Sequence, residues 1–144
     1  MTTDALVTFT LDEQRFALPC MGIRQIIPMV EITQIPDAPQ DTLGIINLHG
    51  QIIPVLNIRA RLNLPEKSYD VLDSLLIAQP DGQAFAFIVA DPSFLSLANV
   101  QSVRVENPIQ GATQVNGIIK DEEGLIKLLD MHQLYQTRHE NTET

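Results

Sequence analysis

The side chains capable of chemistry in this 144-residue sequence are three histidines, one cysteine and a short acidic run. A zinc site needs several ligands at short spacing, but His132 and His139 have no CxxC or HxxxH partner, so both are predicted to be solvated surface residues. Cys20 has Arg24 as its one basic neighbour and no nearby histidine. Because a nucleophilic thiol requires a base and a lowered pKa, Cys20 is interpreted as a buried structural residue. The acidic run 121–123 lacks the ligand periodicity of a calcium loop and is interpreted as a solvated turn.

His49 differs from the other histidines because it stands at a break between two apolar runs, where a side chain would project toward a partner. The sequence contains no glycine-rich phosphate loop, no GxSxG nucleophile motif and no HExxH metalloprotease motif. We therefore predict no enzymatic activity, no cofactor and no metal. A small-molecule-binding barrel or an enzyme that uses His49 is the alternative, and its support is this one histidine.

The element that presents His49 is the stretch Gly44–Arg59, which reads as two strands joined by a tight His-Gly turn. Glycine at position 50 can take the positive φ that such a turn needs. Pro54 has no N–H to donate, so the second strand is predicted to be an edge strand or to carry a bulge.

The remaining elements are predicted from short apolar runs separated by Pro and Gly turns. Strands are expected at Leu6–Leu11, at Phe16–Leu18, in an extended segment over Val30–Ile35, and in a hairpin over Ser74–Val89 that Pro92 breaks, with short strands around Val100, Val103 and Val105. Helical structure is expected as one or two turns at Met21–Ile26, as a short helix or turn at Arg59–Leu64, and as a final helix from the N-cap Asp130 to about Tyr135.

The fold prediction depends on an internal sequence repeat, here called the echo. Gly44-Ile45-Ile46 leads through a turn to Gly50 and an apolar strand ending at Asn57, and Gly117-Ile118-Ile119 leads through Gly124 to a similar strand ending at Asp130. Two related hairpins, one in each half, and many short strands predict an all-β fold with short helices, built as two small packed β-barrels. The alternative interpretation is that the two segments are not related, since any two apolar hairpins have similar sequences. The domain is predicted over 5–136, with a boundary between the two subdomains near the polar residues 66–70 and a polar tail at 137–144.

The totals limit the classes of partner. Hydrophobic residues make up 44% of the chain, enough for a folded core. A net charge of −9 offers no basic face for nucleic acid and opposes direct binding to anionic membranes. One cysteine, no membrane-length apolar run and no signal-peptide pattern at the start predict a cytoplasmic protein.

Taken together, the order of these motifs resembles the CheW-type chemotaxis coupling proteins. The resemblance covers roughly residues 5 to 136. It rests on Phe9-Thr10-Leu11-Asp12 with Phe16-Ala17-Leu18, on the loop Ile35-Pro36-Asp37-Ala38-Pro39, on the whole Gly44–Arg59 hairpin, and on the closing segments Gly117–Ile119 and Gly124–Asp130. The central hairpin and its spacing to the proline-framed loop are the specific part.

The resemblance implies a non-enzymatic scaffold of two five-stranded SH3-like barrels in two-component signal transduction. Its expected partners are the regulatory domain of a CheA-type histidine kinase and the cytoplasmic tip of a chemoreceptor, in chemotaxis or in related type IV pilus motility. The receptor's helical hairpin is expected to lie in a groove between the barrels. The partner-binding positions carried over from the family are Ile23, Gln25, Ile26, Gly44, His49, Gly50, Val89 and Gly117.

The sequence departs from the family pattern at three places. His49 stands where the family usually has arginine, and Gln25 stands where it usually has a glutamate that pairs with that arginine. A neutral hydrogen bond between the two side chains would replace the ion pair; alternatively the contact is lost. Pro92 also replaces a family glycine. The alternative function is therefore a divergent CheW-like module that binds a kinase or another partner without receptor coupling. The receptor, the signal and the oligomeric state are not indicated by the sequence.

Overall fold

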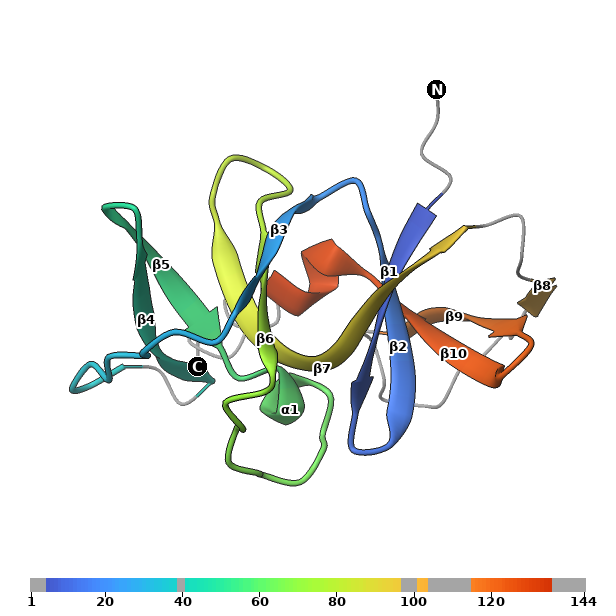
Figure 1. Ribbon diagram of the computed structural model, residues 1–144, viewed down its shortest axis with the longest axis horizontal. Coiled ribbons are helices and arrows are strands. Elements are labelled where there is room, and N and C mark those ends of the chain that lie inside the picture. The colour runs from blue at the N-terminus through green and yellow to red at the C-terminus, as the bar shows by residue number, and fades with distance from the viewer. Residues whose placement is uncertain (1–4, 39–40, 97–100, 104–114, 136–144) are drawn as a thin grey trace. The chain divides into compact units, whose positions relative to one another are not determined.

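The structure is a computed structural model that describes residues 5–38, 41–96, 101–103 and 115–135. Its strands are β1 (Ala5–Leu11), β2 (Gln14–Pro19), β3 (Ile23–Pro28), β4 (Thr42–Leu48), β5 (Gln51–Leu56), β6 (Ser74–Ala78), β7 (Phe85–Ser96), β8 (Gln101–Val103), β9 (Val115–Asp121) and β10 (Gly124–Leu129) (Figure 1). A short helix, α1 (Ile58–Arg61), follows β5, and residues 131–135 are also helical. The predicted all-β class with short helices is confirmed.

The chain divides into two compact units. One unit, here called the central unit, is the continuous segment Gly22–Ala90, and the other, the terminal unit, combines Met1–Met21 with Asp91–Thr144. The division does not fall at residues 66–70, which lie inside the central unit between α1 and β6. Those residues are polar and exposed because they form a surface loop, and a polar loop looks like a boundary in a sequence.

The central unit is a sheet in the order β3-β6-β7-β5-β4. β6 and β7 form the predicted hairpin, with Leu76 opposite Phe87, while β5 joins β7 in parallel at the single pair Val55–Ala86. Every second residue of β4 and β5 points inward, as a half-buried hairpin requires. The core that results is aliphatic and consists of Ile46, Leu48, Ile53, Val55, Leu75, Ile77 and Ala86.

The β4–β5 turn has positive φ at both of its residues, 53° at His49 and 89° at Gly50. This is the backbone of a type I′ turn, whose twist matches that of the flanking strands. Asn47 fixes the turn, because its Oδ1 accepts a hydrogen bond of 2.8 Å from the Gly50 N–H. The predicted His-Gly hairpin is confirmed, with the left-handed conformation extending to His49 as well.

Pro54 is accommodated by the pattern of backbone hydrogen bonds around its partner Ile45. Both polar backbone groups of Ile45 bond to Thr33, at 2.9 Å each, in an isolated bridge between β4 and the segment that follows β3. Ile45 therefore makes no ladder bond to Pro54, its partner in the β4–β5 register, and the missing N–H costs nothing on that side. β5 is flanked by both β4 and β7, but its pairing with β7 is limited to one residue pair, so the edge prediction describes this position only in part.

The terminal unit has the strand order β7-β1-β2-β10-β9-β8, to which β7 contributes residues 91–96. β1 and β2 form a hairpin through Asp12 and Glu13, again with positive φ at both residues. β10 joins β2 in parallel at Lys127–Phe16 and Leu128–Ala17. The buried hydrophobic cluster of the terminal unit consists of Leu6, Ala17, Ile119 and Ile126.

The two units share one topology in circularly permuted order. In each unit, an antiparallel hairpin (β6–β7 or β1–β2) joins in parallel the second strand of another hairpin (β4–β5 or β9–β10). The echoed hairpins also share their register, including a bulge at the same place. Matched pairs are Thr42–Leu56 with Val115–Leu129, Gly44–Val55 with Gly117–Leu128, Ile45–Pro54 with Ile118–Lys127, and Leu48–Gln51 with Asp121–Gly124. The echo is thus confirmed, although Gly124 corresponds to Gln51 rather than to Gly50.

Three expectations are corrected by the structure. Residues 21–26 were expected to be helical, but β3 is a strand because its isoleucines pair with β6, and six residues carry too little periodicity to distinguish the two. Pro92 does not end β7, which continues to Ser96. In the terminal unit, residues 91–96 of β7 form the strand at one end of the described order, and a strand at the edge of a sheet tolerates proline. Finally, the described strand pairings do not close either sheet into a barrel.

Some predicted features lie outside the described residues, namely Val100, Val105, the loop 106–114, His139 and the tail 137–144. The final helix is confirmed at residues 131–135. Asp130 is its N-cap, since its Oδ1 accepts hydrogen bonds from the N–H groups of His132 (2.9 Å) and Gln133 (3.4 Å). Among the described residues no helix is both long and apolar enough to cross a membrane.

The β9–β10 turn is joined to β2 by a bidentate ion pair. Both terminal nitrogens of Arg15 donate to the carboxylate oxygens of Asp121 at 2.8 Å, and the side chains are 25% and 10% exposed. The hydrogen bonds from Arg15 lower the pKa of Asp121 to about 2, from its usual value of 3.8. The folded state therefore favours the charged carboxylate, and this contribution to stability is complete above about pH 4.

We predict that the ion pair makes the stability of the terminal unit depend on acid. Because the pKa of Asp121 is lower in the folded state, its contribution is lost as the pH falls from about 4 toward 2. Asp121→Asn should lower the free energy of unfolding by about 1 kcal/mol at neutral pH, since the pair is partly exposed to solvent, and by much less near pH 2. Urea unfolding at several pH values measures both.

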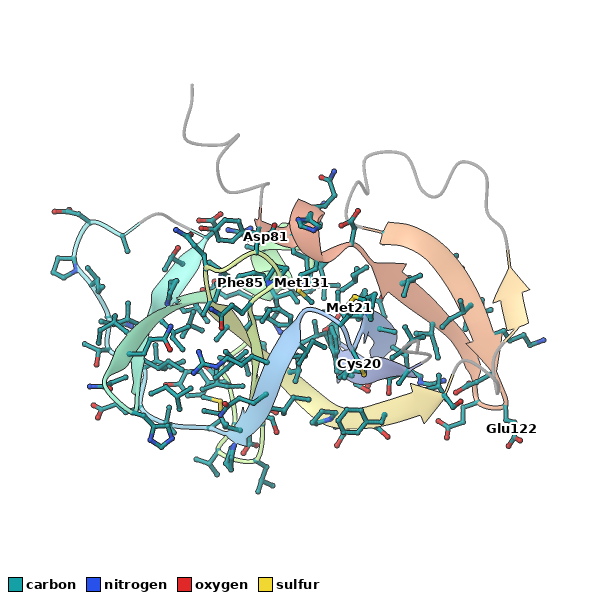
Figure 2. The ribbon with its side chains drawn as sticks, turned by 90° about the horizontal axis from the view of Figure 1, so that it is seen from above. Cys20, Met21, Asp81, Phe85, Glu122 and Met131 are labelled. Atoms are coloured by element: carbon teal, nitrogen blue, oxygen red, sulfur yellow. The ribbon has the colours of Figure 1, made fainter. Side chains whose placement is uncertain are left out.

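The control is Glu122→Gln, which removes a carboxylate from the same turn. Glu122 is exposed at the tip of the hairpin and points away from it (Figure 2). An equal loss of stability at every pH for Asp121→Asn, or the same loss for Glu122→Gln, would contradict the prediction.

Candidate protein-binding surface of the central unit

Almost all of the predicted partner-binding positions belong to the central unit, and Gly117 alone belongs to the terminal unit. Three are on β3, where Ile23, Gln25 and Ile26 are all half-buried. Their backbones pair with Ala78, Ile77 and Leu76 of β6 respectively. These side chains retain enough exposed surface to contact another protein.

The turn His49-Gly50 forms the second exposed part of the surface. Both residues are exposed, and the hydrogen bond from Gly50 to Asn47 holds the turn in one conformation. A turn fixed in this way loses little conformational entropy when a partner binds. The geometry therefore suits His49 to contact with another molecule.

Gly44 and Val89 are placed differently, because both are buried. Val89 is 0% exposed and pairs with Ser74. A Cβ atom on Gly44 would meet the backbone oxygen of Thr33 at 2.3 Å, so this glycine permits close approach of the chain to itself. In this conformation neither residue offers a side-chain surface to a partner, and both can act only by supporting the strands.

Gly117 is the counterpart of Gly44 in the β9–β10 hairpin, but its surroundings differ. Among the residues that the structure describes, a Cβ atom there would meet nothing within 4 Å, and Gly117 is half-buried on β9. None of those residues blocks the approach of a partner's backbone to Gly117.

Among the described residues, no hydrogen bond joins Gln25 to His49. The link between β3 and the β4–β5 hairpin is made instead by Arg24, whose Nη1 donates to Gln51 Oε1 at 2.8 Å. The same nitrogen lies 3.5 Å from Gln79 Oε1, just after β6. The described residues therefore do not form the neutral hydrogen bond between these two side chains, and the neighbouring Arg24 connects β3 to the hairpin.

Sequence reasoning missed Arg24, Gln51 and Gln79. The sequence indicates Arg24 only as a basic neighbour of Cys20, and the predicted helix at 21–26 gives it no connection to the β4–β5 hairpin. A strand with a bulge gives Arg24 a different direction. The signal that could have found it was the β-branched content of Ile23, Ile26 and Ile27, which favours a strand.

Cys20 lies at the end of β2 and is half-buried rather than buried (Figure 2). Partial burial raises the pKa of its thiol, which disfavours the nucleophilic thiolate. His132 is exposed, as predicted. The described part of the chain contains no group of three or more His, Cys, Asp or Glu side chains that could hold a metal ion.

The family is decided by a comparison of the whole chain with models of known domains. Residues 5–139 match the model of the CheW-like domain. The chain belongs to the CheW-like domain family.

Two relatives that match this CheW-like chain along most of its length are chemotaxis proteins. It is 28% identical over 142 residues to the chemotaxis protein CheW of Treponema pallidum (strain Nichols), covering 92% of this chain and 82% of that protein. It is 26% identical over 137 residues to the chemotaxis protein CheW of Bacillus subtilis (strain 168), covering 90% and 85%. Among solved structures, the scaffolding protein TtCheW from Thermoanaerobacter tengcongensis is similar with a TM-score of 0.79 at 26% identity, covering 94% of each chain.

Proposed function

We propose that this protein is a non-enzymatic adaptor that couples chemoreceptors to a CheA-type histidine kinase in chemotaxis. The observation that carries the proposal is the CheW-like domain match over residues 5–139, together with the likeness in fold to a CheW scaffolding protein. The proposed partners are the regulatory domain of the kinase and the cytoplasmic tip of the receptor, which places the protein in the cytoplasm. A motility system driven by type IV pili would use the same coupling.

The proposed contact surface is narrower than the eight positions carried over from the family. The exposed turn His49-Gly50 and the half-buried residues of β3 would meet the partner directly. Gly117 would permit close approach, while the buried Gly44 and Val89 would hold the strands in place. Small surfaces of this kind give modest affinity, so repeated contacts in an array would provide the strength of the assembly.

Calorimetric titration with two separate fragments tests the proposal. We expect the purified protein to bind the kinase regulatory domain and a receptor-tip fragment, and to form a ternary complex when both are present. The absence of any complex with the kinase domain at high micromolar concentration would refute the adaptor function.

A second candidate is a CheW-like regulatory module that binds a kinase but no receptor. It is favoured by the missing hydrogen bond between Gln25 and His49 in the described structure. In that case the double substitution Gln25→Glu with His49→Arg should leave kinase binding unchanged and receptor binding absent. A ternary complex formed by the unaltered protein would exclude this candidate.

A further inference from the structure

Arg24 occupies a β-bulge at the start of β3. The Cα partners of β3 shift register between Ile23, opposite Ala78, and Gln25, opposite Ile77, so Arg24 is the extra residue without a partner in β6. A bulge redirects the side chain of the extra residue and is common beside functional sites. Here the redirected side chain is exposed and extends to the first residue of β5.

Two glutamines hold the Arg24 guanidinium in place. Gln51 Oε1 accepts from Nη1 at 2.8 Å, and Gln79 Oε1 is 3.5 Å from the same nitrogen. Gln79 is itself fixed at both ends. Its Nε2 donates to the backbone oxygen of Gly82 at 2.9 Å, and its backbone N–H bonds to Gly22 at 2.8 Å. The amide of Gln79 is thereby oriented with its oxygen toward Arg24, and the guanidinium is held by neutral acceptors on one of its nitrogens.

The positive charge of Arg24 is not neutralised by the groups that hold it. Amide oxygens carry no net charge, and within the described parts of the chain Arg24 has no carboxylate partner. Both contacts use Nη1, while a guanidinium has five N–H donors in a planar fork that matches a carboxylate. An ordered, exposed and unneutralised arginine is suited to bind a carboxylate on another molecule.

We propose that Arg24 is a carboxylate-binding residue that selects an acidic side chain on the receptor tip. The inference rests on the proposed adaptor function, because it needs a receptor as partner. Its position supports the receptor over the kinase. Arg24 lies between Ile23 and Gln25, and its partner Gln51 directly follows the turn His49-Gly50. Ile23, Gln25, His49 and Gly50 are positions that the family resemblance expects to face the receptor's helical hairpin. An Asp or Glu of the receptor would take a fork-like pair of hydrogen bonds from the guanidinium.

The test measures the binding of a receptor-tip fragment and of the kinase regulatory domain to the same set of variants. Arg24→Ala is expected to weaken receptor binding by about tenfold or more, as the loss of hydrogen bonds to a charged group does. Arg24→Glu should weaken receptor binding further by repulsion. Arg24→Lys should retain only part of the receptor affinity, because an ammonium group lacks the planar pair of donors of a guanidinium. Kinase binding should be unchanged in all three.

Lys67→Ala is the matched control, because it removes one exposed positive charge from the loop between α1 and β6. It should leave both affinities unchanged. Reversing each Asp and Glu of the receptor fragment to Lys in turn should reveal one change that restores binding to Arg24→Glu.

The outcomes separate the inference from the function on which it rests. If the unaltered protein binds both fragments and Arg24→Ala binds the receptor equally well, the role of Arg24 is wrong and the adaptor function stands. An equal effect of Lys67→Ala, or a loss of kinase binding instead, would also overturn the role of Arg24. If the unaltered protein binds neither fragment, the adaptor function itself is refuted. Matching thermal unfolding curves show that each variant is folded.

Discussion

Replacing Gly44 with alanine is expected to lower the free energy of unfolding by about 3 kcal/mol, through backbone strain and a clash at the same position. The φ of Gly44 is 155°, a conformation that residues with a side chain rarely adopt. The added methyl group would meet Thr33 O at 2.3 Å and Ile32 Cγ2 at 2.9 Å. The clash falls beside Ile45, whose two backbone bonds to Thr33 tie the segment after β3 to β4. Urea unfolding of the two proteins measures the difference.

The control for this prediction is built into the chain. Gly117→Ala makes the same change at the corresponding position of the β9–β10 hairpin, where the Cβ atom meets none of the described residues within 4 Å and φ is not in the left-handed region. It should change the free energy of unfolding by less than about 1 kcal/mol. Equal effects of the two substitutions would show that the space around Gly44 does not control stability.

Removing the carboxylate of Asp41 is expected to have a similarly large effect. Its Oδ2 lies 2.7 Å from Nη2 of Arg61, and the two side chains are 16% and 2% exposed. Asp41→Ala takes this carboxylate away from a buried guanidinium, which should lower the free energy of unfolding by about 3 kcal/mol. The backbone oxygen of Asp41 separately accepts a bond of 2.7 Å from the N–H of Asn57, the N-cap of α1, and the substitution leaves this backbone bond available.

A double substitution tests whether charge is the cause. The residue that corresponds to Arg61 after the β9–β10 hairpin is Leu134, which is buried to a similar degree. An aliphatic side chain therefore suits this place in the topology, and Asp41→Ala with Arg61→Leu should recover most of the stability that Asp41→Ala loses. If the double variant is as unstable as the sum of the two single ones, the loss reflects packing around Asp41 rather than the ion pair with Arg61.

Local patterns were enough to predict most of the elements. Alternating apolar residues and turn chemistry identified β1, β2, β6 and the two echoed hairpins, because a half-buried strand has a period of two. The echo even predicted the duplication, since Gly44 and Gly117 occupy one register position. The two hairpins and the many short strands already predicted the all-β class, and the resemblance then identified the family.

The missing parts depend on contacts between distant residues. β3 was misjudged because its strand character comes from pairing with β6, about fifty residues later in the chain. The permuted order could not be anticipated because the polar loop at 66–70 looked like a boundary. Arg24 was missed for the same reason as β3, since its position depends on the bulge and on two glutamines far away in the chain, Gln51 on β5 and Gln79 just after β6.

The continuous central unit and the divided terminal unit imply an order of events during synthesis. Residues 22–90 contain every strand of the central sheet, so that sheet can form while the ribosome is still adding the remainder. The β1–β2 hairpin emerges earlier, yet its parallel neighbour β10 is among the last described segments to be made. Closing such a long loop is entropically costly. A folded central unit lowers this cost, because residues 22–90 of the loop then already have a fixed conformation. We expect β2 to remain unpaired on one edge until the β9–β10 hairpin has been synthesised.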